Sequence, residues 1–135
     1  MRIYGSYTPT KWDENTIQVI EDRMKLTRAT VEFAFSGDIE GIANVEYLMF
    51  YSSFDPEDMS TSHAEYVGQL RISGKLKGKA GSFVLSDSGT FVGGVAHSEL
   101  SIIAGSGTDE LSNISGVGEY SADKQNCTWE MEVSL

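Results

Sequence analysis

The side chains best suited to chemistry are polar groups that share predicted strand faces with large apolar residues. Glu46 alternates with Leu48 in one predicted strand, and Arg71 lies in the middle of another. A charged group on a buried apolar face must be neutralised or paired. The predicted ligand-binding set, drawn from these strands and from a later one, is Glu46, Arg71, Gln69, Asn44, Tyr47, His97 and Glu99.

These residues fit more than one kind of chemistry. Glu46 and Arg71 would orient the polar end of a small organic molecule inside a cavity. Alternatively, Glu46 would act as an acid or base in a cyclase or isomerase. An internal structural pair, or a solvated outer face, explains the same residues without a ligand, because alternation alone does not determine which face points inward. The apolar body of a ligand would lie against Phe33, Phe83, Tyr47 and Trp129.

Other familiar sites are disfavoured, and we predict neither a metal nor a cofactor. His63, His97 and Cys127 lack the spacing of metal ligands. The segment 105–110 lacks the third glycine of a dinucleotide-binding loop, and no lysine follows it as in a P-loop. Cys127 lies on the apolar stripe of a predicted strand, which favours a small buried hydrophobe over a nucleophile.

Composition limits the classes of partner. The chain has 135 residues, enough for one domain spanning 1–135, and a formal net charge of −10. That charge disfavours nucleic acid and anionic membranes, both of which would repel it. No stretch approaches the roughly 20 apolar residues of a membrane span. The absence of an apolar signal segment near residue 1, together with a single cysteine, predicts a cytoplasmic location.

The elements that position these side chains are short strands separated by glycines, which are frequent between Gly68 and Gly118. Residues 25–35 alternate clearly, and Ser36-Gly-Asp38 predicts a tight turn into a strand over 41–51. A loop of two or four residues at this hairpin places Phe33 on the face of Asn44 and Glu46. The other face, with Tyr47, Met49 and Tyr51, is then partly apolar and predicts a homo-oligomer.

Several further elements follow from the same alternation. Residues 3–8 predict a first strand that Pro9 ends, and residues 52–64 predict a mobile loop or a lid over a barrel mouth. A hairpin tip at Lys77-Gly78 places Ile72 opposite Phe83, and Asp87-Ser-Gly89 predicts a turn. Thr108 can cap a single helical turn near 109–113.

The last segment, 127–135, alternates strictly, with Trp129, Met131 and Val133 on one face. A terminal strand this amphipathic should pair with an early strand. The predicted fold class is therefore all-β, a single closed antiparallel β-barrel of about eight strands.

Nearly the whole chain carries runs that resemble a bacterial family of small proteins known only as a domain of unknown function. The runs include Phe35-Ser-Gly-Asp-Ile-Glu-Gly41, 73–85 and Gly105-Ser-Gly-Thr108. The family has glycine where this chain has Asp109, a departure confined to the local turn. The glycine-rich hairpins also resemble those of allene oxide cyclases and dirigent proteins, which implies their closed antiparallel barrel and, by analogy alone, a small organic ligand.

Three functions stay open at this stage. The first is a barrel that binds a small, partly apolar organic molecule. The second is a cyclase or isomerase that acts in the same cavity. The third is a structural or oligomerising module without a ligand.

Overall fold

The computed structural model describes residues 1–135 as eight strands and two single 3-10 turns. The turns are η1 (Met59–Thr61), between β3 and β4, and η2 (Asp109–Leu111), between β6 and β7. The strands are β1 (Arg2–Glu21), β2 (Met24–Gly37), β3 (Ile39–Ser53), β4 (His63–Leu76), β5 (Lys79–Val92), β6 (Val95–Ile102), β7 (Ser115–Ala122) and β8 (Cys127–Ser134).

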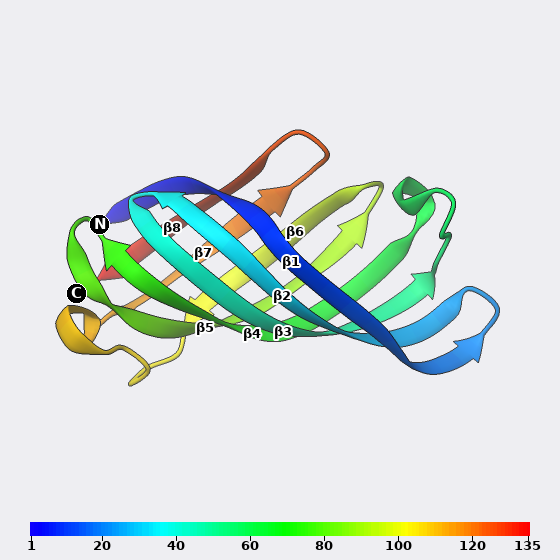
Figure 1. The fold of residues 1–135 in the computed structure, drawn as a ribbon, viewed down its shortest axis with the longest axis horizontal. Helices are drawn as coiled ribbons and strands as arrows, with labels where there is room; N and C mark the ends of the chain where they lie inside the picture. Colours follow the sequence, from blue (N-terminus) through cyan, green and yellow to red (C-terminus); the bar gives the residue numbers. More distant parts are fainter.

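The strands pair in sequence order and close into an antiparallel ring (Figure 1). The ring is sealed between β1 and β8, whose paired residues run from Arg2 opposite Glu132 to Ser6 opposite Thr128. This confirms the all-β fold class, the eight strands and the predicted role of the last segment. Beyond Ser6, β1 pairs only with β2, so residues 7–21 of this strand have a free edge.

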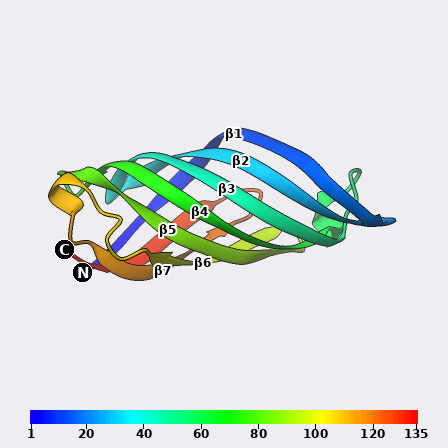
Figure 2. The same ribbon diagram turned by 90° about the horizontal axis from the view of Figure 1, so that it is seen from below.

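The two ends of the ring carry different connections (Figure 2). The chain termini and η2 lie at one end, and the β1–β2 and β3–β4 connections lie at the other. No helix is long and apolar enough to cross a lipid bilayer.

The prediction that Pro9 ends the first strand is wrong. β1 continues to Glu21, with register shifts against β2 between Pro9 and Lys11 and at two later points. Proline is tolerated here because β8 no longer pairs with this part of β1, and an edge strand needs no N–H on its free side.

The prediction that the β2–β3 hairpin has an even number of loop residues is also wrong. Phe35 pairs with Gly41, so an odd number of residues, 36–40, lies between them. The chain turns at Gly37, whose φ of +106° suits glycine, and Asp38 accepts a hydrogen bond from the Tyr4 backbone N–H at 2.9 Å. The face of Phe33 is therefore shared by Tyr47 and not by Glu46.

The inside of the ring follows from the corrected parity. Its 27 buried hydrophobic residues form one cluster, in which Val31, Val45 and Leu70 are almost completely buried. The predicted pairs of Ile72 with Phe83 and of Leu70 with Leu85 are confirmed. On β8, the inward positions Trp129, Met131 and Val133 are buried, also as predicted.

The predicted turn at 87–89 is absent, because β5 runs straight through it. Asp87 pairs with Gly68 on β4 and with Leu100 on β6. Strands on both sides of β5 satisfy its backbone there, so the Asp-Ser-Gly sequence stays extended.

The predicted helical turn near 109–113 exists as η2, at the ring end near the chain termini, and it packs on the inward face of β5, where a Cβ at Gly81 would lie 3.0 Å from Leu111 Cγ. Thr108 does not cap it with its side chain; its hydroxyl instead accepts a hydrogen bond from the Ser82 backbone N–H at 3.0 Å. Leu111 is buried beneath this segment. Asp109 has a φ of +53°, so the backbone conformation there is one that glycine, expected at this position, adopts freely.

Candidate functional site

A pocket of about 170 Å³ enters the ring at the end that carries the β3–β4 connection. Thirteen of its 14 lining residues are hydrophobic. Such a mostly apolar concavity with a few polar groups is the usual form of a small-molecule site. The aromatic lining residues are Tyr7, Trp12, Phe33, Tyr47, Tyr51, Tyr66, Phe91 and Tyr120.

The aromatic rings hold one another in place by edge contacts. Tyr7 lies edge-on to Phe33 and Tyr120, with ring centroids 5.0 and 5.2 Å apart. Tyr47 and Tyr66 make a similar contact at 5.1 Å. Edge-to-face pairs of this kind add to the stability gained from burial, so the pocket wall is well ordered by its own packing.

Two glycines make room for these rings. A Cβ at Gly68 would lie 2.8 Å from the Tyr47 ring, and a Cβ at Gly89 would lie 2.7 Å from the Tyr66 hydroxyl. Both glycines occupy inward positions of neighbouring strands, β4 and β5. Their missing side chains are therefore replaced by the tyrosines of the adjacent strands.

A polar cluster lies beside the apolar pocket, within the ring. The Tyr47 hydroxyl donates to Asp87 Oδ2 at 2.7 Å and is also hydrogen bonded to the Tyr120 hydroxyl at 2.5 Å. Tyr66 and Ser98 form a second hydroxyl pair at 2.5 Å. The other carboxyl oxygen of Asp87, Oδ1, is buried without a hydrogen-bond partner.

Burial governs the ionisation of this cluster. Asp87 is only 1% exposed, and burial raises its pKa above the ordinary aspartate value against smaller lowering effects of the hydrogen bond from Tyr47 and of the nearby Ser98 and Tyr120 hydroxyl groups. Burial also raises the pKa values of Tyr47, Tyr66 and Tyr120, which therefore stay neutral near neutral pH. No Lys, Arg or His side chain is buried in the ring to pair with Asp87.

A second carboxylate lies at the rim of the pocket. Glu14 of β1 accepts hydrogen bonds from Trp12 Nε1 at 2.9 Å, Thr27 Oγ1 at 2.8 Å and the Tyr51 hydroxyl at 3.0 Å. Trp12 and Tyr51 both line the pocket. Glu14 thus fixes the orientation of two wall residues.

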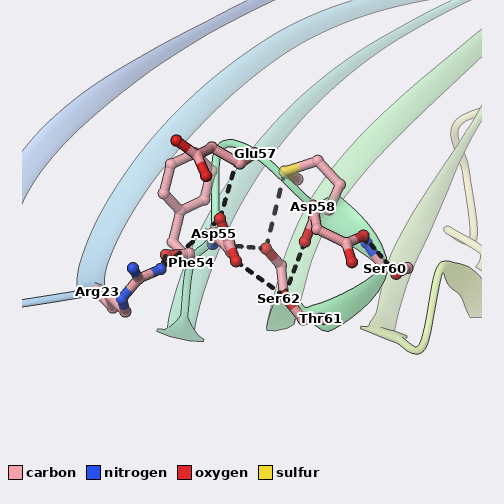
Figure 3. Close-up of polar contacts among 9 residues, drawn as sticks. Arg23, Phe54, Asp55, Glu57, Asp58, Ser60, Thr61 and Ser62 are labelled. Atoms are coloured by element: carbon pink, nitrogen blue, oxygen red, sulfur yellow. Dashed lines mark hydrogen bonds and ion pairs between the residues drawn. The ribbon is translucent and has the colours of Figure 1, made fainter.

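The β3–β4 connection closes over the same end, and Met59 from its 3-10 turn lines the pocket. Figure 3 shows that the connection is held by its own hydrogen bonds. Asp58 Oδ1 accepts from the Ser60 backbone N–H at 3.0 Å, and Ser62 Oγ accepts from the Asp55 N–H at 2.9 Å. Of the two sequence interpretations of residues 52–64, the position of Met59 favours a cover over the ring opening.

Only Tyr47 of the seven predicted site residues points into the ring. Glu46 lies outside, where its carboxylate pairs with Arg28 Nε at 3.2 Å. Asn44, Gln69 and Arg71 are also exposed. Arg71 lies on the neighbouring strand, opposite Asn44, and donates to Ser82 Oγ at 3.1 Å, whereas Glu46 lies opposite Gln69 and pairs with Arg28, so the predicted pair does not form.

His97 and Glu99 are exposed on the outer face of β6. His97 Nδ1 lies 3.2 Å from Ser121 Oγ, and Nε2 lies 3.7 Å from Glu119 Oε2. Outer hollows border Glu46 and His97 and are larger than the inner pocket, at about 540 and 580 Å³. They are open to solvent, whereas a ligand in a specific site is mostly buried, so we give the inner pocket precedence.

The remaining predicted contacts divide between the pocket and the packed core. Phe33 and Tyr47 line the pocket, whereas Phe83 and Trp129 do not. Tyr47, Met49 and Tyr51 are buried, so the apolar face expected to drive oligomerisation is not exposed. No three His, Cys, Asp or Glu side chains lie together as a metal site would require.

Sequence reasoning missed Asp87, Tyr66, Ser98 and Tyr120. A usable signal was present for Asp87, because the pairing of Ile72 with Phe83 and Leu70 with Leu85 extends directly to Gly68 opposite Asp87. That register places the carboxyl on the inward face with Phe83 and Leu85. The predicted turn at 87–89 ended the strand before Asp87, so the register was not extended to it.

Comparisons with known proteins agree with the fold. The family model described as "Protein of unknown function (DUF3224)" matches residues 3–133. A crystal structure of a DUF3224 protein of unknown function from Shewanella oneidensis MR-1 is similar at 21% identity and a TM-score of 0.75, covering 100% of this chain and 97% of that one. This likeness shows the fold alone. No curated protein matches the chain.

Proposed function

Because the chain belongs to the DUF3224 family of proteins of unknown function, we propose from its geometry that it binds a small, partly apolar organic molecule inside the strand ring. The observation that carries the proposal is the aromatic pocket beside the buried Asp87 cluster. An apolar wall supplies the binding free energy, and a few convergent hydroxyl groups supply orientation.

The size of the pocket limits the ligand. A cavity of roughly 150 Å³ lined by apolar side chains holds benzene. The pocket of about 170 Å³ is therefore suited to a single ring with a few further atoms. Larger ligands would have to extend past Trp12 and Met59, which are half exposed at the rim.

Thermal unfolding with and without cumene, a single-ring hydrocarbon, tests this function. A ligand that binds only the folded state raises the melting temperature with concentration. The variant Ala96→Leu fills the pocket and should abolish the shift, because Ala96 lines it. Ala34→Leu, on the outward face of β2, is the matched control and should keep the shift. Equal shifts in both variants would refute binding in this pocket.

Proton transfer is the second candidate function, with Asp87 in the role first assigned to Glu46. The specific observation that favours it is a buried carboxyl with one free oxygen that is linked to the pocket wall through the Tyr47 and Tyr120 hydroxyl groups. An isomerase would show solvent deuterium incorporation into a bound enolisable ketone, and Asp87→Asn should abolish it. Unchanged incorporation in that variant would exclude the role.

We also propose three finer properties. An allene oxide cyclase-like barrel is supported by the closed ring of eight antiparallel strands, and superposition on such a barrel tests it. A cytoplasmic location is supported by the single cysteine, and fractionation tests it. A homo-oligomer is supported by the exposed outer pair Leu48 and Val67, and sedimentation tests it.

A further inference from the structure

The hydroxyl and carboxyl groups beside the pocket can be counted as hydrogen-bond donors. Asp87, Tyr47, Tyr120, Tyr66 and Ser98 make three hydrogen bonds among themselves. With Asp87 ionised, the four hydroxyl groups supply four hydrogens. The three bonds use three of these hydrogens. The fourth would be donated to the unpartnered Oδ1, because burying a carboxylate oxygen without a donor costs free energy.

With Asp87 neutral, the same five groups supply five hydrogens, two more than the three bonds use, and no oxygen carries a charge. One of the two belongs to the Tyr66–Ser98 pair and can still go to the unpartnered Oδ1. Protonation of the carboxyl reverses its hydrogen bond with Tyr47. The carboxyl hydrogen is then donated to Tyr47 and the Tyr47 hydrogen to Tyr120, which leaves the Tyr120 hydrogen for an acceptor in the pocket. Tyr120 lines the pocket, whereas Asp87 does not. The chain of hydroxyl groups therefore transmits the protonation of Asp87 to the pocket wall.

We propose that this chain presents one hydrogen-bond donor, the Tyr120 hydroxyl, to the pocket, so that the preferred ligand is an uncharged ring compound with an acceptor oxygen such as a ketone. The inference rests on the proposed binding function and specifies the chemistry of its ligand. The buried groups that face Asp87 support it. They are the tyrosines Tyr7 of β1, Tyr47 of β3, Tyr66 of β4 and Tyr120 of β7, and none of them carries a positive charge.

An organic cation is the main competing ligand, because the pocket is aromatic and the chain is acidic. A cation would favour an ionised Asp87. The geometry disfavours it, since the tyrosine hydroxyl groups lie between the cavity and the carboxyl, which does not touch the cavity itself. An ammonium group in the pocket would therefore lose its hydration without a direct ion pair.

Four probes of equal size separate these possibilities: cumene, acetophenone, 1-phenylethylammonium and benzoate. Their dissociation constants would be measured by NMR titration at about pH 6, where exposed aspartates are ionised. The test variant is Tyr120→Phe, which removes only the terminal hydroxyl. Tyr66→Phe is the matched control, because it removes a pocket hydroxyl that is hydrogen bonded to Ser98 and not to Tyr47 or Asp87. Circular dichroism and melting establish that both variants are folded.

We expect Tyr120→Phe to weaken acetophenone binding about 2- to 10-fold, the range of one neutral hydrogen bond, while cumene binding stays unchanged. Tyr66→Phe should change acetophenone and cumene binding alike. Equal changes for both probes in Tyr120→Phe, or a selective loss in Tyr66→Phe, would overturn the inference and leave the binding function intact. Preferential binding of 1-phenylethylammonium, lost in Asp87→Asn, would also overturn it. If cumene fails to bind, the binding function itself fails.

Discussion

The substitution Asp87→Asn should make the protein more stable near neutral pH. Asp87 is buried in the ring with one unpartnered oxygen, and burial raises its pKa above the ordinary aspartate value. Asparagine has nearly the same shape but never ionises. The variant therefore removes the free-energy cost of forming a buried carboxylate.

The sign and size of the effect follow from proton linkage. Between the ordinary aspartate pKa and the raised one, the folded protein holds one proton more than the unfolded chain, so its stability falls as pH rises. One proton corresponds to a slope of at most about 1.4 kcal/mol per pH unit. The stability of Asp87→Asn minus that of the wild type should therefore grow with this slope through the window and then level off. Below the ordinary aspartate pKa the two proteins should differ by a constant.

Urea unfolding of both proteins from about pH 4 to about pH 8, followed by tryptophan fluorescence, measures this difference. Asp123→Asn is the control of opposite sign. Backbone hydrogen bonds from Asn126 and Gln125 lower the pKa of Asp123, so its contribution to stability is present above the ordinary pKa and is lost as pH falls. A pH-independent difference between the wild type and Asp87→Asn would show that Asp87 has an ordinary pKa and would refute the argument.

Four further outcomes are expected. Gly89→Ala should destabilise the fold by about 1–3 kcal/mol in urea unfolding, because its Cβ would meet the Tyr66 hydroxyl and the His97 carbonyl oxygen; an unchanged midpoint would contradict this packing. Leu111→Ala should cost about 2–5 kcal/mol, since it is buried between η2 and β5, and a loss below about 1 kcal/mol would show that the segment is loosely attached. Glu46→Gln should change stability by less than about 1 kcal/mol and leave cumene binding unchanged, because its ion pair is exposed; a tenfold loss of binding would restore it as a site residue. Cys127 should react slowly with iodoacetamide at neutral pH and faster at higher pH, because burial raises the pKa of its thiol, and a rate independent of pH would contradict that cause.

Alternation of residue types was enough to predict the closure of the ring. Trp129, Met131 and Val133 lie inside because a period of two on an amphipathic strand specifies its buried face. The β4–β5 register was also predictable, since the tip at Lys77-Gly78 fixes the count. Local sequence carries both pieces of information.

The site was not predictable in the same way. Whether the corner between β2 and β3 holds an odd or an even number of residues determines which side chains of β3 face inward. The hairpin corner at Gly37 contains an odd number of residues, and one residue of error exchanges Glu46 for Tyr47 on the inner face. The corner is set by a long-range contact, since the Asp38 carboxylate accepts a hydrogen bond from the backbone N–H of Tyr4, 34 positions earlier in the chain. Pairing on both flanks likewise keeps Asp87 extended where its neighbours favour a turn.

The short seam between β1 and β8 has a kinetic consequence for the pocket. Only residues 2–6 of β1 pair with β8, and Tyr7, Pro9 and Trp12, immediately beyond them, border the cavity together with Cys127. At this slot the wall consists of side chains and not of a backbone ladder. A ligand bound in the pocket as proposed would therefore enter and leave by side-chain rearrangement, without the partial unfolding of strands that a fully laddered wall would require.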